Sequence, residues 1–308
     1  MTSDSLSLPP GLQVFERGWL SANGALFEGP DGTALVDSGY ASHSAQTVAL
    51  VQRALGSRAL DLLLNTHLHS DHCGGNAALQ MAYPGVRTLI PPGLAASVRA
   101  WDPVALSYAP TGQQCPRFRF DSVLTPGQEM RLGEALWQIH GAPGHDPHSV
   151  ILFEPATRTL ISADALWEDG FGIVFEELEG VKAFDEVAGT LDLIESLAPK
   201  TVIPGHGAVF TNVTGALATA RSRLEGLVRD PAKHARHAAK VLVKFKLLEV
   251  QQMPIVDFRG WALGTVYFGM VHQRFFSEEP LADWIEEVIG ELVRSGAAQR
   301  QGELLLNT

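Results

Sequence analysis

The segment 65–75, which reads NTHLHSDHCGG, carries the densest group of side chains that could perform chemistry. Four of them could bind a metal ion and fall within six residues: His67, His69, Asp71 and His72. A strand that ends in a loop can aim His67 and His69 at one point, with Asp71 and His72 facing a second point nearby. Burying three imidazoles and a carboxylate together is costly without a bound cation. Imidazole and carboxylate ligands suit Zn²⁺ and also accept Mn²⁺ or iron. The segment therefore predicts a metal site.

Apolar strands are expected to position this segment and the remaining candidate ligands. The run LDLLL at 60–64 is typical of a buried strand and leads directly into the segment. Three more expected strands each lead to one further candidate ligand. The strand 135–140 precedes His145, the strand 159–162 precedes Asp164, and the strand 201–204 precedes His206. Each half of the region is thus mostly strands with a few helices and places its candidate ligands after strand ends.

The motifs HLHSDH at 67–72, Gly144-His145, Asp164 and Gly205-His206-Gly207 occur in an order that resembles the metallo-β-lactamase superfamily, and in particular its glyoxalase II-like dinuclear hydrolases. The resemblance covers roughly residues 12–210. It implies an α/β fold, a four-layer αβ/βα sandwich with the site at the edge between two sheets. A short acidic turn at Asp37, after the strand expected over 33–36, resembles the acid that supports the metal loop in this family.

The resemblance also implies a role for each candidate ligand. One metal ion would be held by three imidazoles and the other by a mixed group, with one shared carboxylate: His67, His69 and His145; Asp71, His72 and His206; and Asp164 as the bridge. Two divalent ions, zinc in the first place and manganese or iron as alternatives, can activate a water as a nucleophile near neutral pH. Asp71 would orient that nucleophile and relay its proton.

Function classes differ within such a family, and three stay open. The leading one is a hydrolase that attacks the carbonyl of a small ester, thioester or lactone. An endoribonuclease that uses the C-terminal part of the chain to bind nucleic acid is the first alternative, and an iron-dependent oxidoreductase resembling persulfide dioxygenases is the second. A β-lactamase is disfavoured, since no export signal is visible and Asp164 as the bridge fits the hydrolase branch better.

Aromatic residues around the expected site could form a substrate pocket. The segment 166–175, which directly follows Asp164, and the Pro- and Gly-rich excursion 102–121 are the expected walls. The residues taken as pocket candidates are Trp101, Tyr108, His148, Trp167, Phe171 and Phe175. No cluster of Lys and Arg that would grip a phosphate is visible there.

The chain is expected to divide into a catalytic domain at 1–210 and a helical, winged-helix-like domain at 211–308. Helices are expected over 212–228, 231–250 and 280–294, followed by a small hairpin. The helix 280–294 carries four acids, which would repel nucleic acid: Asp283, Glu286, Glu287 and Glu291. Basic residues between 233 and 246 are the counter-evidence. We therefore expect a small-molecule substrate, with the C-terminal domain shaping the pocket or forming a homodimer contact.

The composition is that of a globular protein with enough apolar residues for a full core. Of the 308 residues, 45% are apolar, and the formal net charge of −11 argues against long-range attraction to nucleic acid or anionic membranes. Met1 to Gln13 shows no basic-then-apolar secretion signal, and no apolar run is long enough to span a bilayer. Two cysteines, Cys73 and Cys115, give no disulfide framework. These features favour a cytoplasmic protein without membrane association.

Overall fold

The computed structural model describes residues 8–308. Its strands are β1 (Leu12–Phe15), β2 (Gly24–Gly29), β3 (Gly32–Val36), β4 (Leu62–Leu64), β5 (Arg87–Ile90), β6 (Ser122–Val123), β7 (Glu129–Leu132), β8 (Ala135–Gly141), β9 (Val150–Glu154), β10 (Thr159–Ala163), β11 (Thr201–Pro204), β12 (Gln252–Pro254), β13 (Ala298–Gln301) and β14 (Leu304–Asn307). Its helices are α1 (Ser44–Leu55), α2 (Ser70–Cys73), α3 (Asn76–Ala82), α4 (Ala95–Ala100), α5 (Tyr108–Thr111), α6 (Phe175–Glu179), α7 (Phe184–Leu197), α8 (Val213–Arg229), α9 (Pro231–Val250), α10 (Ile255–Gly264), α11 (Val266–Phe275) and α12 (Leu281–Arg294), with a 3₁₀ turn at Ala41–His43.

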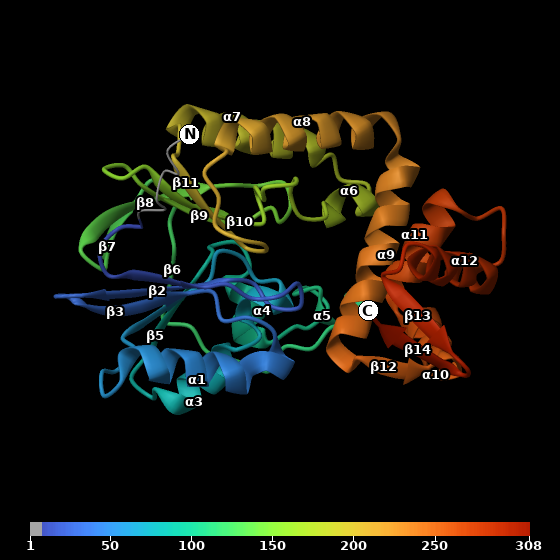
Figure 1. Ribbon diagram of the computed structural model, residues 1–308, viewed down its shortest axis with the longest axis horizontal. Coiled ribbons are helices and arrows are strands. Elements are labelled where there is room, and N and C mark those ends of the chain that lie inside the picture. The colour runs from blue at the N-terminus through green and yellow to red at the C-terminus, as the bar shows by residue number, and fades with distance from the viewer. Residues whose placement is uncertain (1–7) are drawn as a thin grey trace.

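Two sheets stack face to face to form the centre of the molecule (Figure 1). The first has the order β1-β2-β3-β4-β5-β6, and the second has the order β11-β10-β9-β8-β7. Buried side chains from both sheets, including Phe27, Trp137 and Ile161, meet in the core between them. Helices α1 and α3 cover one outer face, and α7 and α8 cover the other (Figure 1). The expected four-layer αβ/βα sandwich is therefore the observed fold.

Parallel strand pairs bring the candidate ligands to one edge of this sandwich. In the first sheet β3 and β4 run parallel, with Val36 opposite Leu64, so the residues that follow them, Asp37 and Asn65, leave the sheet together. In the second sheet β10 and β11 run parallel, with Ala163 opposite Pro204. The carboxyl ends of neighbouring parallel strands meet at the same edge, which is where α/β sheets hold their ligands.

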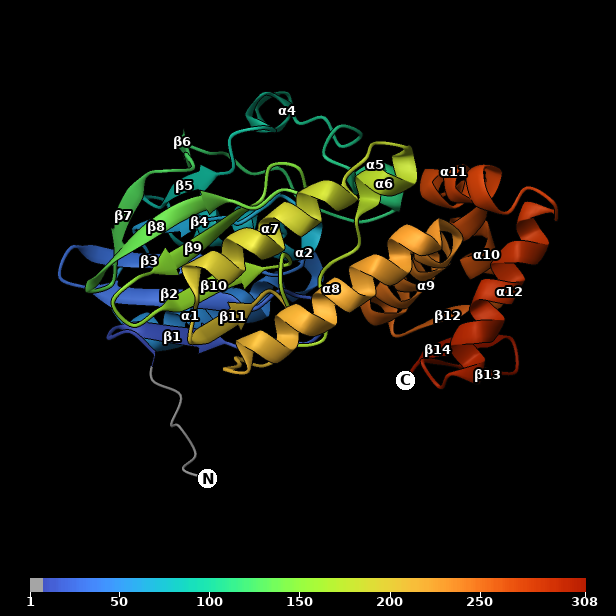
Figure 2. The ribbon, with the colours of Figure 1, turned by 90° about the horizontal axis from the view of Figure 1, so that it is seen from above.

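The C-terminal helices lie beside the sandwich (Figure 2), and their buried side chains form a hydrophobic cluster that also includes Ile173 and Leu178. This C-terminal region consists of α9 to α12 and a small sheet of order β12-β14-β13. Its aromatic residues, including Phe258, Phe268 and Trp284, are buried in this cluster. Helix α8 also lies in the expected segment 211–308, yet its buried Leu217 and Leu224 pack in the core of the sandwich. No helix within residues 8–308 is both long and apolar enough to cross a membrane.

Candidate metal centre and substrate cleft

Asp37 fixes the loop that carries the first candidate ligands. Its Oδ1 accepts a hydrogen bond from the backbone N–H of Thr66 at 2.9 Å, and its Oδ2 accepts one from the Thr66 hydroxyl at 2.7 Å. Asp37 holds a left-handed backbone with φ of +60°, which is strained for a residue with a Cβ. Such strain persists only where surrounding contacts enforce it. The two hydrogen bonds from Thr66 to Asp37 therefore tie the start of this loop to the end of β3.

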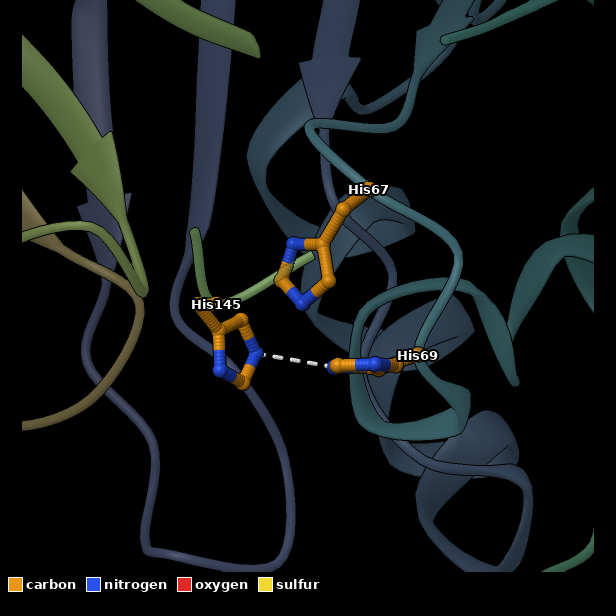
Figure 3. A group of neighbouring side chains, drawn as sticks. All are labelled: His67, His69 and His145. Carbon is orange, nitrogen blue, oxygen red and sulfur yellow. Dashed lines mark hydrogen bonds between the residues drawn. The ribbon is translucent and has the colours of Figure 1, made fainter. Parts of the chain in front are cut away.

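Three imidazoles converge on one point (Figure 3). His67 and His69 come from the loop after β4, and His145 comes from the loop between β8 and β9. The Nδ1 of His69 lies 2.8 Å from the Nε2 of His145. The Nδ1 of His145 donates a hydrogen bond to the carbonyl oxygen of Ile173 at 2.7 Å. Because a carbonyl can only accept, His145 must carry its proton on Nδ1, which leaves the Nε2 lone pair free to bind a metal ion.

A second group of four side chains lies beside the first. It contains Asp71, His72, Asp164 and His206, whose ligand atoms all lie within 4.8 Å of one another. Asp164 contacts both groups, since its Oδ2 lies 3.4 Å from Nε2 of His145 and its Oδ1 lies 3.3 Å from Nε2 of His72. It follows Ala163, whose φ of +46° is again left-handed. A Cβ added to Gly205 would lie 2.1 Å from Oδ1 of Asp164, so a glycine is needed there for the carboxylate to fit.

The charge states of these groups suit cations. Burial lowers the pKa of His67 well below its usual value, and the neighbouring imidazoles lower it further. Burial and the neighbouring His69 also lower the pKa of His145, to about 4. Burial alone would raise the pKa of Asp164, but the imidazoles of His72 and His206 outweigh it and hold the pKa well below its usual range. Burial lowers the pKa of His72, but the carboxylates of Asp164 and Asp37 outweigh it and raise that pKa well above its usual value, so a metal ion would displace a proton from this ring. Neutral His67 and His145 beside an ionised Asp164 form a donor set that attracts a divalent cation.

A buried nitrogen atom without a hydrogen-bond partner also supports a metal site. Nε2 of His67 is buried and has no hydrogen-bond partner among residues 8–308. A buried imidazole nitrogen without a partner carries a desolvation cost, which a bound metal ion would remove. Five imidazoles and two carboxylates in two adjoining groups therefore fit a dinuclear metal site. The donor types suit zinc, manganese or iron.

A cleft of about 100 Å³ opens directly onto these two groups. Besides the candidate ligands, it is lined by residues from the β1–β2 loop, the α5 region, the segment after Asp164 and α9: Trp19, Ser107, Thr111, Gln113, Trp167, Gly172, Ile173, Phe175, Val241, Leu242 and Phe245. A second hollow of about 200 Å³ shares His69, Ser107, His145 and Phe175 with the cleft. The two hollows therefore adjoin each other at His69 and His145.

Comparison with known proteins agrees with this geometry. The sequence profile of the metallo-beta-lactamase superfamily matches residues 17–206. The chain belongs to this superfamily. A hydroxyacylglutathione hydrolase of Brucella anthropi is 26% identical over 218 residues, which cover 70% of each chain. The chain spans 46% to 70% of the length of the hydroxyacylglutathione hydrolases that it matches.

Two solved structures extend the comparison. A beta-lactamase domain protein from Burkholderia ambifaria has a TM-score of 0.61 at 20% identity, covering 98% of this chain and 94% of that one, so the shared fold includes the C-terminal region. A protein crystallised in a di-iron-bound form has a TM-score of 0.51 at 27% identity, over 68% of this chain and 98% of its own. That relative shows two iron ions bound on this fold in another chain.

The pocket residues expected from the sequence divide into two sets in this superfamily member. Trp167 and Phe175 line the cleft, and His148 lines the second hollow with Phe175. Trp101, Tyr108 and Phe171 do not line either hollow. The Trp101 ring packs against the Phe118 ring at 5.4 Å between centroids, and Phe171 is buried in the core beside α7 and α8.

Tyr108 supports the metal loop from behind. Its side chain is buried, and its hydroxyl donates a hydrogen bond at 2.9 Å to the carbonyl oxygen of Leu68, the residue between His67 and His69. Cys73 also lies here, with its Sγ 3.2 Å from the Tyr108 hydroxyl. Neither the phenol of Tyr108 nor the thiol of Cys73 lines the cleft or the second hollow.

Several cleft residues were not identified from the sequence. Trp19 lies in a loop with no motif around it, and its ring stacks on the His206 ring at 5.5 Å with an interplanar angle of 11°. Val241, Leu242 and Phe245 belong to α9, far from the metal motifs in sequence. Their apolar spacing of one and four residues, within an otherwise basic helix, was the available signal of a buried face.

Proposed function

We propose that the protein is a dinuclear metallohydrolase that cleaves a small carboxylic ester, thioester or lactone. Membership of a metallohydrolase superfamily and similarity to hydroxyacylglutathione hydrolases support a hydrolase. The observation that carries the proposal is the position of Asp164 between the three-imidazole group and the rest of the second group, because this one carboxylate could help to hold two ions. We propose zinc as the physiological metal, with manganese and iron as the tested alternatives.

The chain's own residues account for orientation and proton handling. When bound, two divalent ions would supply Lewis acidity toward the carbonyl and water acidic enough to act as a nucleophile near neutral pH. Burial alone would raise the pKa of Asp71, but the hydrogen bond from His206 at 3.1 Å and the charge of His72 hold it below its usual value. Asp71 is therefore ionised, and its carboxylate can orient a water in the cleft and accept its proton.

Two aromatic residues that line the cleft, Trp167 and Phe175, limit the access of bulk water to the reacting carbonyl. Trp167 forms one wall of the cleft and donates a hydrogen bond from its Nε1 to Oδ1 of Asp164 at 3.2 Å. Phe175 contacts the His69 ring edge-on at 5.7 Å between centroids. Both rings exclude water from the carboxylate and imidazole, which strengthens electrostatic interactions with a reacting group.

Contacts within the C-terminal region favour a small-molecule substrate over nucleic acid. Arg236 of α9 pairs with Glu287 and Glu291 of α12, and Lys240 pairs with Glu291 at 3.1 Å. The basic face of α9 is thus turned toward the acidic face of α12 and is not left free for phosphates. Lys244 donates to the carbonyl of Ala297, and Lys246 pairs with Glu249 in the same helix.

The test combines metal analysis with a substrate panel. Purified full-length protein is reconstituted separately with zinc, manganese and iron, and its metal content is measured. Each form is then assayed on thioesters, aryl esters, lactones, a single-stranded RNA and a glutathione persulfide with oxygen. We expect close to two metal equivalents and turnover of the carbonyl substrates. Turnover of RNA alone, or oxygen-dependent turnover of the persulfide alone, would overturn the proposal in favour of a nuclease or an oxidoreductase.

A further inference from the structure

We infer that the natural substrate is a neutral ester or thioester whose apolar acyl chain lies between two tryptophans and helix α9, and that the site disfavours anionic leaving groups such as glutathione. This inference deepens the proposed hydrolase function and rests on it. It separates this chain from the hydroxyacylglutathione hydrolases that it resembles, because those proteins are named for a substrate whose leaving group carries two carboxylates.

The first support is the apolar wall that α9 adds to the cleft. Val241, Leu242 and Phe245 lie one and four residues apart on this helix and face the candidate metal ligands across the cleft. Phe245 is held in place by Tyr40, whose ring it meets edge-on at 5.0 Å between centroids. The wall is therefore a fixed apolar surface contributed by the C-terminal region.

The second support is a pair of tryptophans on the other side. Trp19 lies parallel to the His206 ring and meets the Trp167 ring edge-on, at 5.3 Å between centroids with an interplanar angle of 72°. The Trp19 side chain is 58% exposed, although each aromatic ring can bury a large apolar area. An exposed tryptophan beside a candidate metal ligand, at the mouth of an apolar cleft, has surface to bury against an acyl chain.

The third support is the sign of the charges around both hollows. Among the residues that line them, which all belong to the described part of the chain, none is Lys or Arg. The second hollow instead contains Asp146, Glu176 and Glu179. Arginines near the site are engaged elsewhere: Arg223 lies over the Phe171 ring, and Arg274 donates to the carbonyl of Leu178. A carboxylate on the leaving group would therefore find no Lys or Arg partner in either hollow and would face three acids in the second one.

A matched set of thioesters tests both halves of the inference. N-acetylcysteamine thioesters are neutral, and glutathione thioesters are anionic; each is made with acetyl, butanoyl and hexanoyl groups. Each methylene removed from water can strengthen binding by up to about fourfold. We expect kcat/KM to rise at least about tenfold from acetyl to hexanoyl, and the neutral hexanoyl thioester to exceed the glutathione one by at least about tenfold. The ratio of kcat/KM between the neutral and the glutathione hexanoyl thioester should shrink as the salt concentration rises.

Variants assign these effects to the named residues. In Phe245→Ala and in Trp19→Ala, kcat/KM should rise less steeply with acyl chain length than in the wild type. Phe245→Leu should give a slope between those of the wild type and Phe245→Ala. The matched control is Phe276→Ala, which removes a ring from the C-terminal cluster away from the cleft and should keep the wild-type slope. The double variant Glu176→Gln/Glu179→Gln should lower the kcat/KM ratio of the neutral thioester to the glutathione thioester. Asp192→Asn, which changes an acid on the outer face of α7, should leave this ratio unchanged.

A binding measurement separates this inference from the proposed function. Tryptophan fluorescence is titrated with two inert thioethers, S-hexyl-N-acetylcysteamine and S-hexylglutathione, using protein reconstituted with zinc. Tighter binding of the neutral thioether without any hydrolysis would uphold the preference of the cleft for neutral, apolar ligands and refute the hydrolase function. Hydrolysis that prefers glutathione thioesters, or that does not depend on chain length, would uphold the hydrolase and overturn the inference. Absence of both binding and hydrolysis would overturn both.

Discussion

Nδ1 of His72 lies 2.8 Å from Oδ2 of Asp37, in a pair that is almost completely buried. A carboxylate can only accept, so it holds the proton of His72 on Nδ1 and leaves Nε2 facing Asp164 and the second ligand group. One acidic residue at the end of β3 thus selects the ring form of a candidate metal ligand that is 35 positions later in the chain.

Replacing this acid should weaken metal binding without removing any ligand. In Asp37→Asn, the side-chain amide can donate to Nδ1 of His72, which favours the ring form with its proton on Nε2 and blocks the ligand atom. We expect metal affinity to fall about 10- to 100-fold, measured by competition with a chromogenic chelator. Asp31→Asn, in the exposed turn between β2 and β3, is the control and should bind metal like the wild type. Unchanged affinity in Asp37→Asn would refute this role.

The two ligand groups should respond differently to single substitutions. Asp164 contacts both groups, whereas His206 contacts only the second one. Asp164→Ala should therefore lower the bound metal to clearly below one equivalent, and His206→Ala should leave about one equivalent. Elemental analysis of protein purified without chelator gives both values. Equal losses in the two variants would show that Asp164 does not bridge.

Cys73 lies next to a candidate ligand and should nevertheless be dispensable for metal binding. Its Sγ contacts the carbonyl oxygen of His69 at 3.3 Å and Sγ of Cys115 at 3.8 Å, on the side away from the ligand atoms. Cys73→Ala should keep the wild-type metal content and reduce the free energy of unfolding by about 1 kcal/mol. Loss of a metal equivalent, measured on the same preparation as urea unfolding, would place the thiol in the site.

The sequence predicted the candidate metal ligands, whose positions follow from the strands just before them. It predicted the cleft wall less well, because that wall depends on how distant parts of the chain pack together. Ligands such as His67 and Asp164 follow apolar strands directly, so the strand pattern also predicts the sheet edge on which they lie. Tyr108 lies in the loop expected to cover the site, and Phe171 lies seven positions after Asp164, but both side chains are buried in the protein and do not line the cleft. Phe245 reaches the cleft only because the C-terminal region packs against Tyr40, a contact that no local pattern encodes.

Two histidines of α9, the buried His234 and the half-buried His237, should make the protein acid-sensitive. Burial lowers the pKa of His234 and of His237 to about 4, and the nearby Arg223 adds to this. Between pH 6.5 and 4 the unfolded chain binds more protons at these sites than the folded one, so stability falls as pH falls through this window. His234 alone contributes a slope of up to about 1.4 kcal/mol per pH unit.

His234→Gln removes this titration while keeping an acceptor for the backbone N–H of Val174. The free energy of unfolding is measured by urea titration at pH 7 and pH 5, with metal removed from both proteins so that the ligand histidines contribute equally. The wild type should lose more stability than His234→Gln between the two pH values. An equal loss in the two proteins would assign the acid sensitivity to other groups.

Truncation should reveal where the catalytic sandwich ends. A chain stopped after Val209 lacks α8, whose Val213, Leu217 and Leu224 are buried in the core of the sandwich, so it should expose that core and aggregate. A chain stopped after Asp230 keeps α8 and loses α9 with its part of the cleft wall. It should remain more soluble and retain metal, yet bind S-hexyl-N-acetylcysteamine at least about tenfold more weakly than the full chain, because each methylene left in water forfeits up to about fourfold in binding. Equal solubility of the two truncated chains in a sedimentation assay would contradict the structural role of α8.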